Sequence, residues 1–352
     1  MEQEQIQYFS TNLTANEVPF RDALLKGQAP DRGLYLPNRI PTFTKDELHS
    51  FKDLPYHEIA FSIARKFLMN EIPVDELHRI VKEAYNFDVP LEKVYKRHYL
   101  LRLDQGPTAS FKDFAARMMG RLMQYFLQKE NRNLLILTAT SGDTGSAIAN
   151  AFYDLHNINV IILFPEKEIT DRQRKQMTTL GKNIQVIGID GKFDDCQSMV
   201  KKAFADDDLK DLNLSSANSI NIGRLLPQSM YYVYTWSQLA KRNENIVFAV
   251  PSGNFGDLMG GIIAKHMGLP VKKFVVCTNA NDEVPVYLKT NIYKTIVPSK
   301  NCVSSAMNVG HPSNMARIIS LYGGVMNEKG EITREPDLDK IKSDLWGMSI
   351  TD

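Results

Sequence analysis

The sequence has little of several features that mark common protein classes. It contains only three cysteines, Cys196, Cys277 and Cys302, which are far apart and show no spacing with histidine typical of a metal site. We therefore expect no structural disulfide, no metal ion, and a reducing, cytoplasmic compartment. No apolar run is long enough for a transmembrane helix, and we expect no signal peptide because the first thirty residues lack an apolar core.

An excess of charge of either sign is also missing. Lysine and arginine total 42 and aspartate and glutamate total 41, which gives a formal net charge of +1. A chain without such an excess has no long-range field to attract nucleic acid or a membrane surface, so we expect a small-molecule partner. The 352 residues are enough for two domains with a large buried core.

Short apolar runs alternate with helical patterns over most of the chain. Strands are expected at 134–138, 160–164, 184–189, 246–250 and 274–278, and helices at 146–156, 171–180, 194–206 and 258–267. Buried strands joined by helices form parallel sheets with right-handed crossovers. We expect an N-terminal, mainly helical region (1–105), a smaller α/β domain (106–235) and a large α/β domain (236–352).

A Gly-Pro turn precedes a helical pattern whose first turn contains Lys112. Thr108 or Ser110 is expected to cap this helix. Asp113 is expected on its wet face, with Arg117 as its partner one turn later. Lys112 instead has small and apolar neighbours at helical spacing.

The position of Lys112 favours a neutral amine. A helix N-terminus disfavours a cation by about 0.3–1 kcal/mol, and burial lowers the pKa of a lysine. A neutral amine is what Schiff-base formation with an aldehyde requires. The alternative is a lysine that buries its methylene groups and extends its ammonium to water.

Two similar loops each follow an expected strand and open an expected helix. They are Ser141–Gly145 (SGDTG) and Ser252–Gly256 (SGNFG). In open α/β sheets ligands bind at such loops, so two of them indicate two units around a shared cleft. The second loop can present its amides to an anion at a helix N-terminus, although it could be a tight connector. The first loop has no lysine after its glycines, which argues against a Walker-type nucleotide site.

Other polar residues have two open interpretations. Thr140, Ser141 and Thr144 can donate hydrogen bonds to a carboxylate or can cap a helix. Asn221 and Arg224 can bind a phosphate-bearing ligand, or Asn221 can be a cap while Arg224 pairs with a surface carboxylate. His311 has no partner at a recognisable spacing, so we expect a structural role in its loop.

Several segments of the sequence resemble one enzyme family. The segment from Gly106 to Arg117 (GPTASFKDFAAR) is similar to the lysine motif of threonine synthases, which are pyridoxal-phosphate enzymes of the tryptophan-synthase-β structural group. The N-terminal segments YFSTN (8–12), PFRDALLKG (19–27) and APDRGLYLP (29–37) are similar to the opening of that family. The resemblance continues to about residue 325, and together these motifs are highly specific.

The resemblance implies a fold, a cofactor and an activity. The fold is type II of the pyridoxal-phosphate enzymes, with two open parallel-type α/β domains that share the cofactor cleft. Lys112 would form the Schiff base with pyridoxal 5'-phosphate and move protons during the reaction. The activity would be a lyase reaction of threonine biosynthesis that converts O-phospho-L-homoserine and water to L-threonine and phosphate, in a monomer or homodimer.

The resemblance also assigns the remaining site residues. The cofactor phosphate would be held by the second loop, at Gly253, Asn254, Phe255, Gly256 and Asp257. Asp143 would lie beside the cofactor ring, where related enzymes often have asparagine. The substrate would contact Thr140, Ser141, Thr144, Asn221 and Arg224.

Two departures from the family pattern leave other functions open. Gln105 replaces a histidine that commonly precedes the lysine motif, and the sequence ends at Asp352 without the family's later Asp/Glu-Pro-His and His-Pro-Ala-Lys motifs. We therefore expect a truncated or incomplete copy with an unpaired sheet edge. The alternatives are a related phospholyase, a serine or threonine dehydratase, a fragment that binds the cofactor without turnover, and, least favoured, an amino-acid-binding regulatory module.

Overall fold

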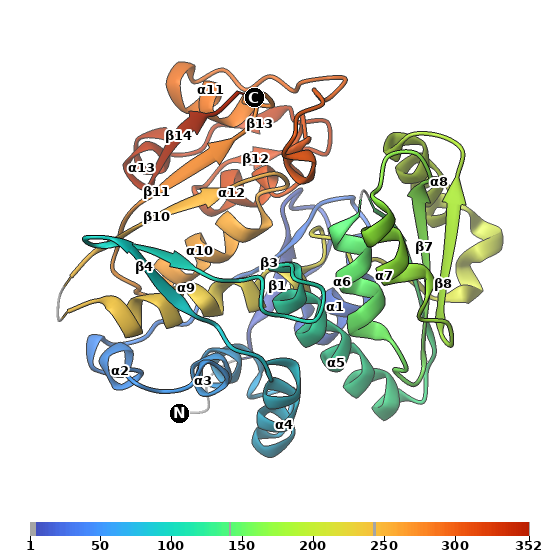
Figure 1. The fold of residues 1–352 in the computed structure, drawn as a ribbon, viewed down its shortest axis with the longest axis horizontal. Helices are drawn as coiled ribbons and strands as arrows, with labels where there is room; N and C mark the ends of the chain where they lie inside the picture. Colours follow the sequence, from blue (N-terminus) through green and yellow to red (C-terminus); the bar gives the residue numbers. More distant parts are fainter. Residues whose placement is uncertain (1–4, 141, 242–243, 352) are drawn as a thin grey trace.

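The computed structural model describes residues 5–140, 142–241 and 244–351. Two parallel sheets lie on opposite sides of the molecule, and the N-terminal segments pack below and between them (Figure 1). One continuous cluster of buried apolar residues extends from Ile6 to Leu345 through all of these parts. The expected class of fold, α/β with parallel sheets, is confirmed.

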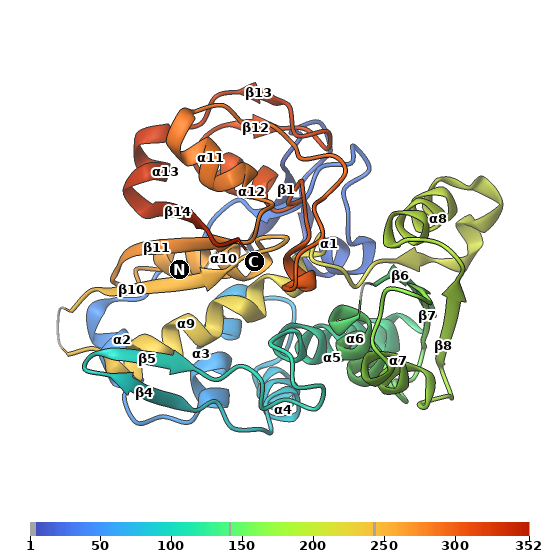
Figure 2. The same cartoon turned by 45° about the horizontal axis from the view of Figure 1, so that its top comes forward.

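The first sheet contains four parallel strands in the order β8-β7-β6-β9. Its strands are β6 (Leu134–Ala139), β7 (Ile158–Pro165), β8 (Ile184–Ile189) and β9 (Leu214–Ser215). Its helices are α5 (Lys112–Glu130), α6 (Asp143–Phe152), α7 (Asp171–Thr178) and α8 (Phe193–Ala205). Helices α5, α6 and α7 lie on one side and α8 on the other (Figure 2).

The second sheet contains three parallel strands in the order β10-β11-β14. Its strands are β10 (Ile246–Pro251), β11 (Val271–Thr278) and β14 (Leu345–Ser349). Its helices are α9 (Leu226–Leu239), α10 (Gly256–His266), α11 (Glu283–Thr290) and α13 (Leu338–Asp344). The five strands expected from the sequence are therefore confirmed in the two sheets. The expected domain boundary at residue 235 falls inside α9, which packs on α10, and the domain division remains a prediction.

The N-terminal region contains short helices and a small antiparallel sheet. The helices are α1 (Phe20–Lys26), α2 (Lys45–Ser50), α3 (Tyr56–Leu68) and α4 (Val74–Ala84). The strands β1 (Gln7–Ser10), β2 (Val18–Pro19) and β3 (Tyr35–Pro37) form one sheet, and β4 (Leu91–Tyr95) and β5 (His98–Leu101) form a hairpin. Helix α2 starts with a capping box, in which the side chains of Thr44 and Glu47 bond each other's amides.

The remaining elements are short and lie mainly between α9 and α13. They are η1 (Asp207–Leu212), η2 (Ile222–Arg224), η3 (Ser305–Met307), α12 (Met315–Leu321), β12 (Val325–Met326) and β13 (Ile332–Arg334). Helix α12 matters most for the site because it begins directly after Asn314, whose side chain donates to the carbonyl of Asn254 in the loop before α10.

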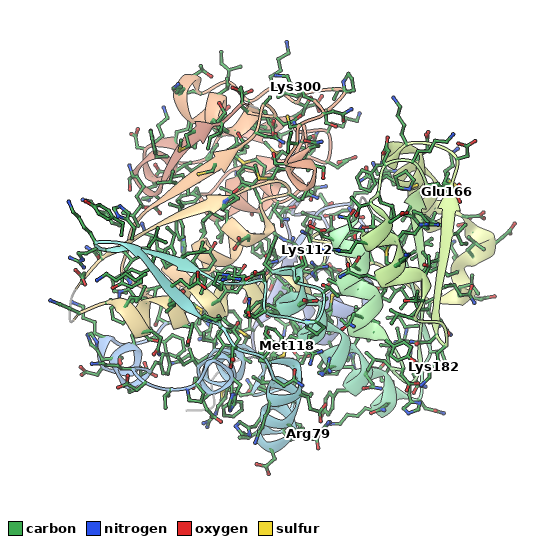
Figure 3. The ribbon with its side chains drawn as sticks, in the orientation of Figure 1. Arg79, Lys112, Met118, Glu166, Lys182 and Lys300 are labelled. Carbon is green, nitrogen blue, oxygen red and sulfur yellow. The ribbon has the colours of Figure 1, made fainter. Side chains whose placement is uncertain are left out.

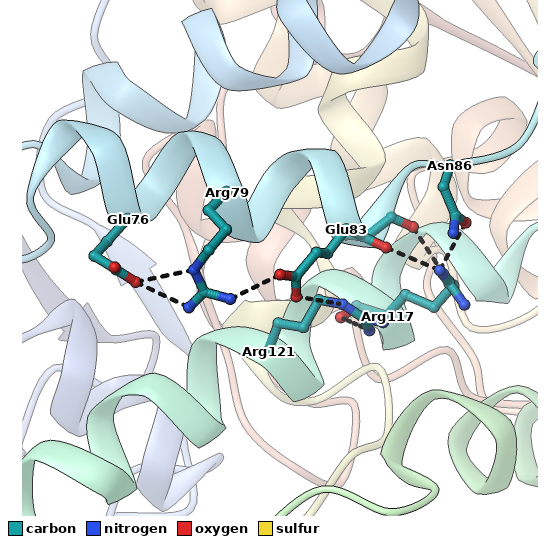
Figure 4. A network of polar contacts seen from close by, with 7 residues as sticks. Glu76, Arg79, Glu83, Asn86, Arg117 and Arg121 are labelled. Carbon is teal, nitrogen blue, oxygen red and sulfur yellow. Dashed lines mark hydrogen bonds and ion pairs between the residues drawn. The ribbon is translucent and has the colours of Figure 1, made fainter.

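Arginine side chains join α4 to α5 (Figure 4). Arg117 of α5 donates to the carbonyl oxygens of Glu83 and Ala84 at the end of α4 and to Oδ1 of Asn86. Asp113 is fully buried, and its carboxylate accepts hydrogen bonds from the amide and hydroxyl of Thr108. The expectation of a wet Asp113 paired with Arg117 is wrong, because the Gly-Pro turn folds back over the first turn of α5.

Two absences among the described residues bear on the class of site. No helix among them is long and apolar enough to cross a membrane. Within the same residues, no group of three or more histidine, cysteine, aspartate or glutamate side chains is placed to hold a metal ion.

Candidate active site

Lys112 is the first residue of α5 and lies near the middle of the molecule (Figure 3). Its Nζ atom is 3.7 Å from Oδ2 of Asp143 and 4.5 Å from the centre of the Phe111 ring. The residue in the capping position is Phe111, so the predicted cap at Thr108 or Ser110 is wrong. Ser110 still contributes, because its hydroxyl accepts a hydrogen bond from the Lys112 amide at 3.3 Å.

The surroundings of Lys112 lower the pKa of its amine. Burial is the largest cause, and the nearby charge of Arg224 acts in the same direction. The carboxylates of Asp143 and Asp257 oppose this effect and raise the pKa in part. The chain thus brings four expected site residues within electrostatic range of each other, and their net effect with burial is to lower the pKa of the amine.

The first loop leads from β6 into α6, which begins at Asp143. The hydroxyl oxygen of Thr140 accepts hydrogen bonds from the amides of Gly142, which is the N-cap residue, and of Gly145 in the first turn, so Thr140 stabilises the start of this helix. Thr144 lies half-buried in the first turn, and Ser141 lies outside the described residues.

Asp143 has a partner that the sequence did not suggest. Its Oδ1 accepts a hydrogen bond from Nε2 of Gln173 at 2.8 Å, while its Oδ2 faces Lys112. The same Gln173 forms a capping box with Thr170 at the start of α7. The capping box is visible in the sequence, but the contact with Asp143 depends on how α7 packs on α6. Asp143 is thereby held in place beside the lysine.

The second loop leads from β10 into α10 and leaves backbone donors free. Among the described residues, the amides of Gly253, Asn254, Phe255 and Gly256 have no hydrogen-bond acceptor. Phe255 has the left-handed φ of 61°, which turns the chain into the helix. A Cβ atom at Gly253 would lie 2.7 Å from the carbonyl oxygen of Ala306, so only glycine fits there. Free amides at a helix N-terminus are suited to binding an anion.

The carboxylate of Asp257 points into the protein. It accepts hydrogen bonds from the hydroxyls of Tyr231 at 2.6 Å and Tyr232 at 2.7 Å. Burial raises the pKa of Asp257, and the charge of Lys112 partly opposes this rise. Its side chain therefore leaves the loop's amides without a competing anion, and only its backbone is suited to a phosphate.

Asn221 and Arg224 differ in what they can offer a ligand. Asn221 is fully buried and uses its side chain internally: it donates to the carbonyls of Leu24 and Ser216 and accepts from the Gly223 amide. This geometry favours the structural-cap interpretation. Arg224 is also buried, but it donates to the carbonyl of Ala217 rather than to a surface carboxylate.

Arg224 retains an unused donor. No described group accepts from its Nε atom, and burial lowers its pKa to about 10, so it remains a cation at neutral pH. A buried arginine with a free donor near Lys112 is suited to an anionic substrate group.

Gln228 of α9 presents a second unsatisfied group near the glycine loop. Its Oε1 atom is buried without a partner among the described residues, and it would lie 3.2 Å from a Cβ atom at Gly256. Gly256 also meets Ser219 and Asn314. Polar side chains from three separate segments therefore surround the start of α10. The sequence did not suggest that they lie together. The ring of His311, by contrast, contacts the hydroxyl of Tyr293.

The geometry fits an aldehyde cofactor that carries a phosphate. A buried amine with a lowered pKa supplies the group for the covalent bond, and the free amides after β10 supply an anion site. The amides lie at the end of a strand in a parallel sheet, where such folds bind ligands, and the amine lies at the start of α5, beside the loop residue Asp143 that follows β6. The fold and the site together define a pyridoxal-phosphate-dependent enzyme of fold type II.

Comparison with known proteins specifies the family. The family model "Threonine synthase N terminus" matches residues 7–85, and the model "Pyridoxal-phosphate dependent enzyme" matches residues 89–333. Threonine synthase from Buchnera aphidicola is 44% identical over 311 residues, which cover 87% of this chain and 72% of the relative. The enzyme from Escherichia coli is 42% identical over 308 residues, 87% and 71% of the two chains.

Solved structures agree with these relatives. The pyridoxal-phosphate-bound threonine synthase of Brucella melitensis superposes with a TM-score of 0.91 at 34% identity, covering 99% of this chain and 79% of the other. The Escherichia coli structure gives a TM-score of 0.87 at 37% identity, with 98% and 78% covered. The chain belongs to the threonine synthase family. It is a pyridoxal-phosphate-dependent lyase of threonine biosynthesis, and pyridoxal 5'-phosphate is its cofactor.

Proposed function

We propose that the substrate is O-phospho-L-homoserine and that the products are L-threonine and phosphate. The observation that carries this proposal is a pair of buried groups. Lys112 has an amine whose pKa is lowered by burial, and Arg224 is a separate cation whose Nε donor is unused. An amino acid with a terminal phosphate needs both groups. The reaction is expected in the cytoplasm, since the three cysteines are free.

Lys112 performs the proton transfers. Its amine removes the proton from Cα of the substrate, and the bound cofactor supplies the electron sink that stabilises the resulting negative charge. The same amine then removes a proton from Cβ, so that the C–O bond at Cγ breaks and phosphate leaves. Cγ receives a proton and becomes the methyl group, hydroxide from water adds at Cβ, and a proton returns to Cα; the remaining proton of water leaves with the phosphate. An amine that must both hold and release a proton works best with a pKa near the operating pH, and burial moves the pKa of Lys112 in that direction.

The other residues bind and orient. The loop from Gly253 to Asp257 holds the cofactor phosphate through its amides, with Asn254, Phe255 and Gly256 between them. Asp143 lies beside Lys112 and the cofactor ring. The substrate carboxylate is held at the start of α6 by Thr144, with Ser141 as a proposed further donor and Thr140 fixing the loop.

The substrate phosphate is assigned to Arg224. Asn221 supports it indirectly, because its side chain shapes η2, the turn that carries Arg224. Arginine is suited to phosphate because its planar fork can donate two parallel hydrogen bonds.

Side-by-side assays test the substrate. Phosphate release is measured with O-phospho-L-homoserine and phosphoethanolamine, and 2-oxo-acid formation is measured with L-threonine and L-serine for the dehydratase alternative. We expect threonine and phosphate from O-phospho-L-homoserine alone. Turnover of serine or phosphoethanolamine at a higher kcat/KM would overturn the assignment. With Arg224→Gln, KM for O-phospho-L-homoserine should rise about tenfold or more, as expected for the loss of a charged hydrogen bond.

A further inference from the structure

Arg317 of α12 is a fully buried cation that joins three distant segments. It donates to the carbonyl oxygens of Tyr35, Ser219 and Ile220 and to Oδ1 of Asn314. Tyr35 belongs to the N-terminal sheet, whereas Ser219 and Ile220 precede η2, the turn that carries Arg224. The guanidinium thus holds the N-terminal region against the polar segment before α9.

Asn314 extends this contact to the loop that precedes α10. It accepts from Arg317 at 2.7 Å, and its amide group donates to the carbonyls of Asn254 at 3.0 Å and Ser219 at 3.3 Å. The amide and hydroxyl of the neighbouring Ser313 face Oδ1 of Asn254 as well. Arg317 is therefore linked to the loop with the free amides by hydrogen bonds through the side chain of Asn314.

The charge of Arg317 lacks a counter-ion in the protein. Within the described residues no carboxylate lies within ion-pair distance of its guanidinium, and burial alone lowers its pKa, to about 9, so it stays charged at neutral pH. All four of its partners are neutral oxygens. A buried charge is costly unless an opposite charge is near.

We propose that Arg317 is a positioning residue whose charge is balanced by the cofactor phosphate at the loop from Gly253 to Asp257. Asn314 carries the guanidinium's hydrogen bond to that loop, so the amides are fixed in place and the local potential favours a dianion. This inference depends on the proposed assignment of the loop to the phosphate.

Comparing pyridoxal 5'-phosphate with pyridoxal separates charge balance from general structural support. The cofactor-free protein is titrated with each compound, and the ratio of the two dissociation constants gives the preference for the phosphate. With Arg317→Gln we expect this preference to fall about tenfold or more, with a smaller change for pyridoxal. Asn314→Asp gives Arg317 a carboxylate beside it and should reduce the preference in the same way, which keeps the test decisive should Arg317→Gln fail to fold.

Two control variants separate the role of Arg317 from the proposal that the loop from Gly253 to Asp257 binds the phosphate. Arg121→Gln removes another largely buried arginine, which donates to the carbonyl of Arg117, so it should lower the melting temperature and leave the phosphate preference unchanged. Gly253→Val displaces the loop and should abolish much of the preference. An unchanged preference in Arg317→Gln and Asn314→Asp, with a loss in Gly253→Val, would overturn the role of Arg317 alone. An unchanged preference in all three would show that the loop does not hold the phosphate.

Discussion

The chemistry depends on how the charge of one lysine is balanced. Burial and the neighbouring Arg224 lower the pKa of Lys112, while Asp143, whose Oδ2 is 3.7 Å from the amine, raises it. Gln173 fixes the orientation of that carboxylate by donating to its other oxygen. Since Asp257 of α10 also raises it, the pKa of the amine is set by charged residues from three different elements, η2, α6 and α10.

Replacing Asp143 should make Lys112 easier to deprotonate. Asp143→Asn removes a negative charge that stabilises the ammonium, so the pKa of Lys112 should fall further. The pH at which the cofactor is captured at half its maximal rate should then move to lower pH, which stopped-flow absorbance can measure. Asp154→Asn is the control. It removes an exposed carboxylate that is paired with Lys182, and it should leave the pH profile unchanged. A shift of the Asp143→Asn profile to higher pH would contradict this account.

At the scale of elements, α5 is held at both ends of its first half. Asp113 accepts from the turn that precedes the helix, and Arg117 bonds the last carbonyls of α4. The orphan carbonyls at a helix end need such donors. These contacts fix where α5 begins, and hence where Lys112 lies.

Removing Arg117 should destabilise the fold. Arg117→Met leaves the buried carbonyls at the end of α4 without donors, which costs about 1–3 kcal/mol in the free energy of unfolding. Arg79→Met removes an exposed arginine from the same network, paired with Glu76 and Glu83 and drawn beside Arg117 in Figure 4. Because exposed ion pairs contribute little, its cost should be about 0.5 kcal/mol or less. Equal costs in urea titrations of the two variants would show that Arg117 is no structural support.

At the scale of the whole molecule, polar contacts join segments that are far apart in the sequence. Glu71 accepts from the amides of Phe20 and Arg21 at the start of α1, and Arg317 bonds the carbonyl of Tyr35. Not every buried charge is satisfied in this way. Glu283 of α11 is buried, and neither oxygen of its carboxylate has a hydrogen-bond partner among the described residues.

Glu283 should make stability depend on pH. Burial raises its pKa from the ordinary 4.5 to about 7, so the protonated form favours the folded state. The stabilisation is present below pH 4.5 and is lost as pH rises to about 7. Glu283→Gln should therefore increase the free energy of unfolding at pH 8 by about 1–3 kcal/mol and change it little at pH 4. Urea titrations at both pH values measure this, and an equal effect at the two would contradict the assigned ionisation.

The sequence predicted the elements better than the contacts between them. The parallel strands and the two loops followed from apolar runs and from glycines after strands, because these signals are local. The burial of Asp113 and the internal use of Asn221 did not follow, because both depend on chain segments that pack from far away. The contacts of Gln173, Gln228 and Arg317 could not be predicted either, because they too depend on distant segments of the chain. Nothing in the spacing of these residues marks them as neighbours of the site.

The central claim is that Lys112 is the residue that bonds the cofactor. The direct measurement is borohydride reduction of the protein with pyridoxal 5'-phosphate, followed by peptide mapping by mass spectrometry. We expect the pyridoxyl group on the peptide that contains Lys112, and no stable label in a folded Lys112→Ala variant. A label on another lysine, or none in the unaltered protein, would contradict the account.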